Sequence, residues 1–423
     1  MTRRQAALAA LLALALATPQ AATATATTAG AAPVSTPRVA TRHVDYHAWD
    51  TQARLADGRA TGVEVRRGAV TVAAEPAGHR KYDGRRYATG RWVSPWHAPG
   101  FGYTELVASW QARTPGDSFV EVAVRGRTAA GRVSSWDLLG RWAAGDRHVD
   151  RRTVSGQSDD LAGVAVDTWR VEPDRGLAGY QLRVTLLRGR GSTGPVVDGL
   201  GAVASRLPAT APGTSRPGPG SGTVLDVPRY SQMVHSGHYP RWGGGGQAWC
   251  SPTSTSMVLG YYDALPPAKA WSWIPDGHTD PWVDFAARAT YDHGYDGTGN
   301  WPFNTAYAAT RTGHAFVTRL RNLREAGRFI EAGIPVVASI SFGSGELDGA
   351  PISASDGHLL VVVGFTRAGD VVVNDPAAQH RRGVRRTYDR AQFEDAWLPT
   401  SGGTAYIVRD DTHPLPTGAS PGW

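Results

Sequence analysis

The sequence predicts two domains, an N-terminal all-β sandwich or jelly roll and a C-terminal α+β domain. Within residues 43–205, short runs alternate apolar with polar residues, and Gly, Pro and Asp separate the runs. Such runs at intervals of about 8–12 residues are typical of β-sandwiches. Residues 206–222 are rich in Pro and Gly, which predicts an extended linker between separately folding domains. The second domain is placed at 223–410, and the Pro-, Gly- and Ser-rich tail at 411–423 is expected to be disordered.

The first domain offers no clear catalytic group. Its histidines are isolated in the sequence, so packed or surface imidazoles are a simpler interpretation than a metal site: His47, His97 and His148. Its tryptophans are interpreted as sandwich core rather than as a sugar-binding platform: Trp92, Trp96, Trp110, Trp136 and Trp142. A role in binding carbohydrate or the cell wall therefore rests on architecture alone, and architecture does not fix a function.

Residues 1–26 have the order of regions found in secretory signal peptides. Two arginines near the start precede an apolar Ala/Leu run from Ala6 to Ala17, and small-residue sites such as Ala22-Thr23-Ala24 follow. The apolar run is too short for a stable membrane span, so we expect its removal and export of a secreted, extracellular protein. A flexible spacer is expected at 27–42.

The charge balance argues against a nucleic-acid-binding protein. The chain has 44 Lys and Arg against 37 Asp and Glu, a formal net charge of +7, and its basic residues are scattered among acidic ones. Nucleic-acid-binding proteins instead concentrate Lys and Arg in patches or stripes. The mild positive charge allows only a weak attraction to an anionic cell wall. No second apolar run is long enough to predict a membrane span.

The only cysteine of the chain, Cys250, lies where a helix is predicted to begin. Pro252 is tolerated only in the first turn of a helix and Ser251 is a good N-cap, so the helix should start at about Ser251. Apolar residues then recur at the three-to-four spacing of a helix with one buried face. At a helix N-terminus the unpaired N–H groups favour thiolate over thiol, and the thiolate is the nucleophile. A buried, inert cysteine is the alternative.

A histidine and an aspartate lie at the same end of a predicted β-hairpin. His358 begins the run 358–365, and Asp375 follows a second run at 370–374. The short, Gly-bearing segment between the runs predicts an antiparallel turn. Counting pairs from this turn leaves His358 and Asp375 about three or four positions out of register, so a twist or bulge must bring them together. With Cys250 they would supply a nucleophile, a base and an orienting carboxylate.

Three stretches in this order resemble the papain-like cysteine peptidases of the bacteriocin-processing, double-glycine leader family: SQM…WCSPTSTSMVL, DGHLLVVVGF and VVVNDPA. The likeness is greatest to the secreted, single-chain bacterial relatives. It covers residues 224–409 approximately and implies a papain-like α+β fold for the second domain. It also implies a catalytic triad of Cys250, His358 and Asp375, and a glutamine that helps to form the oxyanion hole.

Two departures from the family pattern concern the site. Ser251 follows the nucleophile where the family commonly has Gly, and a Gly-rich insertion at 243–246 separates Gln232 from Cys250. Gln247 is nearer in the sequence, but on the approach to a helix its side chain should point elsewhere. Gln232 is therefore the favoured oxyanion donor, and Gln247 is the alternative.

No metal or other cofactor is expected. Residues 292–300 have a faint likeness to a calcium loop but lack its final acidic residue. The pair His235 and His238 has no predicted helix, third ligand or cysteine pair that would suggest zinc.

Three functions compete. The leading hypothesis is an exported cysteine peptidase that hydrolyses peptides or proteins. The second is an acyltransferase or amidase on the same fold, either transglutaminase-like or directed at wall peptides. The third is a non-catalytic protein that binds the cell wall or carbohydrate through its β-sandwich.

Overall fold

A computed structural model describes residues 41–172, 174–210, 212–418 and 422–423. The expected signal peptide at 1–26 and nearly all of the expected spacer at 27–42 lie outside these residues. Among the residues that are described, no helix is long and apolar enough to cross a membrane.

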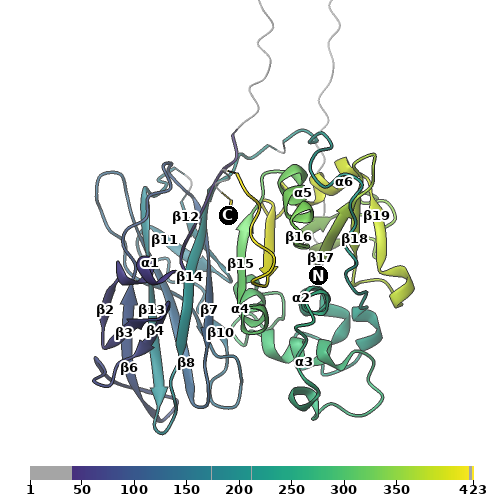
Figure 1. Ribbon diagram of the computed structural model, residues 1–423. Coiled ribbons are helices and arrows are strands. Elements are labelled where there is room, and N and C mark those ends of the chain that lie inside the picture. The colour runs from purple at the N-terminus through teal and green to yellow at the C-terminus, as the bar shows by residue number, and fades with distance from the viewer. Residues whose placement is uncertain (1–40, 173, 211, 419–421) are drawn as a thin grey trace, which may run out of the picture. The chain divides into compact units, whose positions relative to one another are not determined.

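The described part of the N-terminal region forms two antiparallel sheets of seven strands each (Figure 1). The first sheet has the order β11 (Ala162–Ala165), β12 (Thr168–Val171), β7 (Glu105–Arg113), β14 (Val196–Arg206), β4 (Ala69–Val72) and β3 (Val63–Arg66), and β1 (His43–Trp49) also pairs with β14. The second has the order β10 (Arg152–Thr153), β9 (Asp137–Trp142), β8 (Ser118–Arg127), β13 (Gly179–Gly189), β6 (Arg85–Val93) and β2 (Arg59–Thr61), and β5 (Gly78–Tyr82) also pairs with β6. A short helix, α1 (Gln52–Ala56), follows β1.

Apolar residues of both sheets form one hydrophobic core, which agrees with the predicted N-terminal β domain. Three of the tryptophans assigned to this core are indeed buried, with at most 2% of their surface exposed: Trp92, Trp110 and Trp142. Trp96 and Trp136 are only partly buried, and the guanidinium of Arg125 lies over both rings. The expectation that these two tryptophans belong to the core is therefore wrong.

The histidines of this domain are not isolated in space. The rings of His47 and His97 stack with 4.1 Å between their centroids, and His97 contacts the Asp45 carboxylate at 2.6 Å. His148 contacts the guanidinium of Arg85. Long-range strand pairing creates these neighbours, so the spacing of histidines along the chain could not show them.

The described part of the C-terminal region has one six-stranded antiparallel sheet and accompanying helices. The strand order is β15 (His314–Arg319), β20 (Thr404–Arg409), β16 (Val336–Phe342), β17 (Ser355–Phe365), β18 (Val371–Asn374) and β19 (Arg385–Tyr388). The α-helices are α2 (Cys250–Tyr261), α3 (Pro281–Thr290), α4 (Trp301–Thr312), α5 (Leu323–Glu331) and α6 (Arg390–Trp397). The 3-10 helices are η1 (Gln232–His235), η2 (Gly246–Ala248), η3 (Ala268–Trp271) and η4 (Arg381–Gly383). The α+β mixture agrees with the predicted class, and the papain-like layout stays a prediction.

From His358 onward, strand β17 is buried on both faces, which explains the uninterrupted apolar sequence of this part. Its residues 359, 361 and 363 pack into the same apolar cluster as α2. Residues 360, 362 and 365 pack into a second cluster with α5 and α6. In Figure 1, α2 accordingly lies across the sheet from α5 and α6.

Hydrogen bonds hold the Pro- and Gly-rich segment 206–222 against the second domain. Both the N–H and the hydroxyl of Ser215 donate to the Glu394 carboxylate at 2.6 Å. The N–H of Gly220 donates to Glu331 at 3.1 Å. Residues 215–222 of this segment therefore lie against α5 and α6 and do not form a free tether.

The C-terminal segment also makes contacts in its described part. Trp423 packs against Phe329 with 4.7 Å between ring centroids, and Asp411 contacts His314 at 2.8 Å. The domain boundaries themselves stay a prediction.

The segment that contains α3 and α4 packs directly against the β domain. Phe303 of α4, only 1% exposed, belongs to the apolar core of that domain. Arg288 of α3 donates two hydrogen bonds to Asp146, at 2.7 and 2.8 Å. The N–H of Thr153 donates to Asp292 at 2.9 Å. Apolar packing and polar contacts thus join the two domains at one interface.

A glycine in β17 provides a test of how the linker docks. A Cβ at Gly364 would lie 2.2 Å from the carbonyl oxygen of Thr223, the residue directly after the linker, so Gly364→Ala must displace the backbone at which the linker joins the second domain. We expect a loss of about 1–3 kcal/mol in the free energy of unfolding, measured by urea denaturation. Gly357→Ala in the same strand is the matched control, because a Cβ there has no neighbour within 4 Å. Equal stability of the two variants would contradict the tight docking of the linker.

Candidate active site

Cys250 is the first residue of α2, one residue before the expected start at Ser251. Pro252 lies in the first turn as predicted, but the Ser251 hydroxyl contacts the Tyr406 hydroxyl at 2.9 Å instead of capping the helix. The helix is buried on all sides from Ser251 to Leu259 rather than on one face. Cys250 itself is partly exposed. A fully buried helix thus presents the thiol at its accessible end.

A β-bulge brings His358 and Asp375 to the same face of the sheet. The ladder between β17 and β18 shifts its register between Val362 and Gly364. A regular ladder would leave Asp375 three positions from the residue opposite His358, and the shift reduces this offset to two. Because side chains alternate between faces, an even offset makes the two residues diagonal neighbours on one face. The expected irregularity of the hairpin is therefore present.

Three donors hold the Asp375 carboxylate. They are His358 Nε2 at 2.8 Å, the Tyr388 hydroxyl at 2.7 Å and the Ala377 N–H at 3.0 Å. His358 is 2% exposed and Asp375 is fully buried. Cys250 is a second hydrogen-bonding partner of His358. Since Nε2 faces the carboxylate, Nδ1 is the ring nitrogen left for the thiol.

These contacts determine the charges of the His358–Asp375 pair. Burial alone lowers the pKa of His358, but the charge and hydrogen bond of Asp375, together with those of Cys250, raise it to about 10. Burial also opposes the ionisation of Asp375, but the charge of His358 and three hydrogen bonds hold its pKa below the ordinary value. The surroundings therefore favour a charged imidazolium beside the Asp375 carboxylate.

The side chain of Gln232 lies next to the start of α2. Its Nε2 donates to the carbonyl oxygen of Gln247 at 2.6 Å, and its backbone N–H donates to Pro376 at 2.9 Å. An amide nitrogen carries two protons, so one remains for another acceptor. The exposed side chain of Gln247 instead contacts Gly237 and Gly244 within its own loop. Of the two candidate glutamines, only Gln232 is a buried side chain directed at this turn.

Cys250 lines a cleft of about 460 Å³ that has walls from both domains. The second domain contributes Leu359 and residues 295–299, among others. The β domain contributes the tip of the β11–β12 hairpin, residues 165–168, and Arg170. Sequence reasoning did not predict any part of the first domain in this cleft.

The hairpin tip has an unusual backbone and a well-held carboxylate. Val166 has a φ of +55°, a strained value for a β-branched residue. Asp167 accepts hydrogen bonds from the Trp301 N–H at 3.2 Å and the Thr168 hydroxyl at 3.1 Å, and burial raises its pKa to about 6. Contact with the second domain through Trp301 thus fixes the tip at the cleft.

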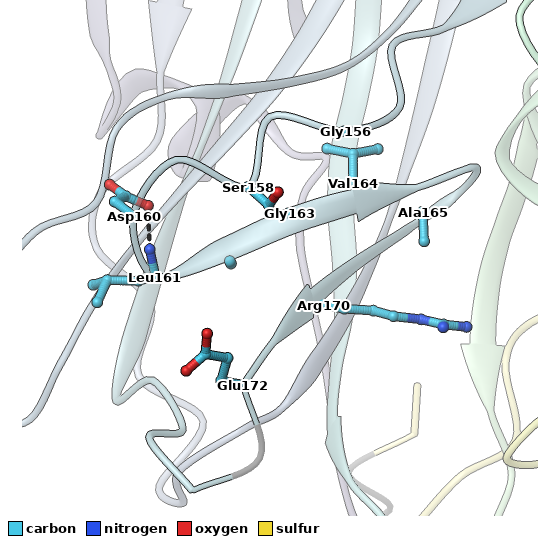
Figure 2. A pocket seen from close by; sticks show the side chains of 10 residues that line it. Gly156, Ser158, Asp160, Leu161, Gly163, Val164, Ala165, Arg170 and Glu172 are labelled. Carbon is cyan, nitrogen blue, oxygen red and sulfur yellow. Dashed lines mark hydrogen bonds between the residues drawn. The ribbon is translucent and has the colours of Figure 1, made fainter.

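A second cavity, of about 290 Å³, lies on the β domain around β11 (Figure 2). All of its lining residues come from the region 156–172. Figure 2 shows the carboxylates of Asp160 and Glu172 and the guanidinium of Arg170 spread apart rather than directed at one point. The cavity therefore has no converging polar groups of the kind that surround Cys250.

Comparison with known families gives two matches. Residues 45–205 match the model described as the Peptidase C39 N-terminal domain. Residues 224–405 match the model described as the Peptidase_C39 like family. The two matches support a cysteine peptidase of the C39 family. None of the curated proteins matches the chain significantly.

The C39 matches cover almost the same residues as the two predicted domains. The structure places His358 against both Asp375 and Cys250, and it places the side chain of Gln232 at the turn that precedes Cys250. The catalytic roles of these residues stay a prediction. Sequence reasoning missed Tyr388, which donates to Asp375 from β19. It also missed Asp284, which contacts both His235 and His238. No local pattern pointed to either residue, because both contacts depend on the tertiary fold.

The raised pKa of His358 predicts a stability that depends on pH. The folded chain binds this proton more tightly than the unfolded chain, for which the pKa is 6.5. The stabilisation is therefore complete below pH 6.5 and is lost as the pH rises through about 10. We expect the difference in free energy of unfolding between the wild type and His358→Gln to decrease over this interval, as measured by urea denaturation. The control His380→Gln, at an exposed histidine, should show no such trend. If the difference in free energy of unfolding between the wild type and His358→Gln were the same at every pH, the assigned positive charge of His358 would be wrong.

Proposed function

We propose that this C39 peptidase cleaves peptide bonds with a triad of Cys250, His358 and Asp375. The Cys250 thiolate attacks the carbonyl carbon of the scissile bond and forms a tetrahedral oxyanion. When this intermediate collapses, the C–N bond breaks and His358 gives its Nδ1 proton to the leaving amine. A water molecule then loses a proton to His358 and attacks the thioester, which releases the carboxylic acid and regenerates the thiolate.

The observation that carries this proposal is the contact of the buried His358 with both Asp375 and Cys250. An imidazole whose one nitrogen is fixed by a carboxylate presents the other nitrogen to the nucleophile in a defined tautomer. Cys250 is the only cysteine, so a cysteine peptidase built on this chain can use no other thiol. Its partial exposure at a cleft gives a substrate access to the sulfur.

We assign the stabilisation of the oxyanion to Gln232 and the backbone N–H of Cys250. The first N–H groups of a helix have no intrahelical acceptor and carry the positive end of its dipole. The amide of Gln232 is positioned next to this end by its bond to Gln247. Two donors of this kind act on the negative charge that develops in the transition state.

The β domain is proposed to form one wall of the substrate cleft. Its hairpin tip and Arg170 line the same cleft as Cys250. The Arg170 side chain is 65% exposed, and the nearest Glu105 carboxylate oxygen is 3.8 Å away, too far for a hydrogen bond. The guanidinium is therefore accessible to an acidic group of a bound peptide.

Secretion is also proposed. Its support is the order of regions in residues 1–26, in which a basic start precedes an apolar run and small-residue sites. N-terminal sequencing of the protein recovered from the culture medium would test it.

Covalent labelling and hydrolysis test the proposed triad together. A thiol-directed epoxide should add one mass equivalent to the wild type and none to Cys250→Ala, which should also lose all hydrolysis of a peptide library. Release of free carboxylic acid separates hydrolysis from acyl transfer to an added amine. Gln232→Ala should reduce kcat by about 10²–10³ with little change in KM. Gln247→Ala is the matched control and should retain the wild-type kcat. Hydrolysis by Cys250→Ala would overturn the proposal.

A charge reversal tests the contribution of the β domain. Arg170→Glu should change the ratio of kcat/KM between acidic and basic peptides by about fivefold to tenfold. The change should appear in KM, because Arg170 contacts neither the thiol nor the imidazole in the proposed mechanism. Arg132→Glu, at an exposed residue outside the cleft, should leave the ratio unchanged. An unchanged ratio for Arg170→Glu would show that this wall does not meet the substrate.

A further inference from the structure

Three histidines converge on one buried carboxylate beside the proposed active site. His235 ends η1, His238 follows three residues later, and His278 lies in the loop before α3. Asp284, in the first turn of α3, is fully buried. We propose that this cluster binds a divalent transition-metal ion, with zinc as the best-fitting ion. The ligands are His235, His238 and Asp284, and His278 completes the set.

The distances within the cluster fit such a site. Nδ1 of His235 lies 2.9 Å from Asp284 Oδ2, and Nδ1 of His238 lies 2.8 Å from Oδ1. All three ligand atoms lie within 4.8 Å of one another. Ligands about 2.0–2.2 Å from a tetrahedral zinc ion are separated by about 3.3 Å. Only a small outward movement of each ring would therefore open the space that an ion requires.

His278 provides the second, independent observation. Its Nδ1 is buried and lacks a hydrogen-bond partner in the described part of the chain, and it lies 3.7 Å from Asp284 Oδ1. That distance is too long for a hydrogen bond but close to the separation of two ligands on one ion. The ring of His278 also stacks on that of His238, with 3.8 Å between centroids. Its Nδ1 is thus held at the edge of the cluster without a partner there.

Hydrogen bonding alone explains only part of the cluster. The two oxygens of Asp284 accept from His235 and His238, which leaves the buried nitrogen of His278 unsatisfied at a cost of about 1–3 kcal/mol. A bound ion would accept a lone pair from each of the three imidazoles. Imidazole and carboxylate ligands suit zinc, copper and nickel, whereas calcium and magnesium prefer oxygen ligands.

The position of the cluster suggests what the ion would do. Gln232 begins the same 3-10 helix that His235 ends. The ring of His235 lies 6.2 Å from that of Trp249, the residue before Cys250, and a Cβ on Gly246 would meet His235 at 2.0 Å. An ion would therefore fix both the oxyanion glutamine and the start of α2. This consequence rests on the proposed function, whereas metal binding itself does not.

Calorimetric titration of the full chain with zinc chloride tests the site. The Cys250→Ser variant, stripped of metal with EDTA, is the starting protein, because it removes the thiol as a competing ligand and the readout needs no activity. We expect one zinc ion per chain. His238→Ala and His278→Ala should each weaken the affinity at least about tenfold. Both residues are partly exposed, at 22% and 23% of their side chains, so these variants should fold.

His380→Ala is the matched control, since this exposed histidine lies outside the cluster. It should bind zinc as tightly as the parent protein. Cobalt(II) should give the intense visible absorption of a tetrahedral complex in the parent and lose it in His238→Ala. Absence of stoichiometric binding, or equal affinities of the His238 and His380 variants, would overturn the proposal. Zinc should also raise the melting temperature of the parent but not of His238→Ala.

Discussion

The contact between His358 and Asp375 removes two ionisable side chains from water, and much of the surrounding structure compensates for that removal. A buried ion pair is destabilising unless further hydrogen bonds satisfy its remaining groups. Here the Tyr388 hydroxyl and the Ala377 N–H donate to the carboxylate, and Cys250 is a partner of the imidazole. The pair is thus embedded in a small network of donors. The same network that makes the pair tolerable directs the imidazole to the thiol, so stability and the proposed chemistry depend on one set of contacts.

The His358–Asp375 contact also requires a particular backbone geometry. His358 and Asp375 lie on the same face of the sheet because of the bulge in β17. A one-residue change of register moves a side chain to the opposite face. The carbonyl oxygen of Pro376, directly after the aspartate, accepts the N–H of Gln232. Helix α2 is fixed to the same strand, since Ser254 donates to the carbonyl oxygen of Leu359 at 3.0 Å. Hydrogen bonds to main-chain carbonyl oxygens therefore position the strand, the turn and the helix relative to one another.

The sequence contained the identity of the proposed site residues but not their geometry. Cys250 could be placed at a helix start because Pro252 allows few alternatives, and the hairpin follows from short-range turn signals. The bulge could not be located, since the apolar runs that flank the turn fit several registers equally well. Gln232 could be favoured over Gln247 only weakly, because the choice depends on a loop of four glycines. The shared carboxylate of Asp284 could not be foreseen at all, as Asp284 lies 46 positions after His238 in the sequence.

The packing of the two domains changes how the N-terminal domain is interpreted. From the sequence it could be regarded as an independent binding unit joined by a Pro/Gly tether. In the structure Phe303 packs into its core, and Asp292 accepts hydrogen bonds from Thr153 and Asn300. Asp292 and Phe303 flank the segment 295–299, which lines the cleft on the side of the second domain. The β domain thus anchors one wall of the cleft and supplies the other through Arg170. The proposed role of this domain toward a substrate therefore rests on the shape and charge that it gives the cleft.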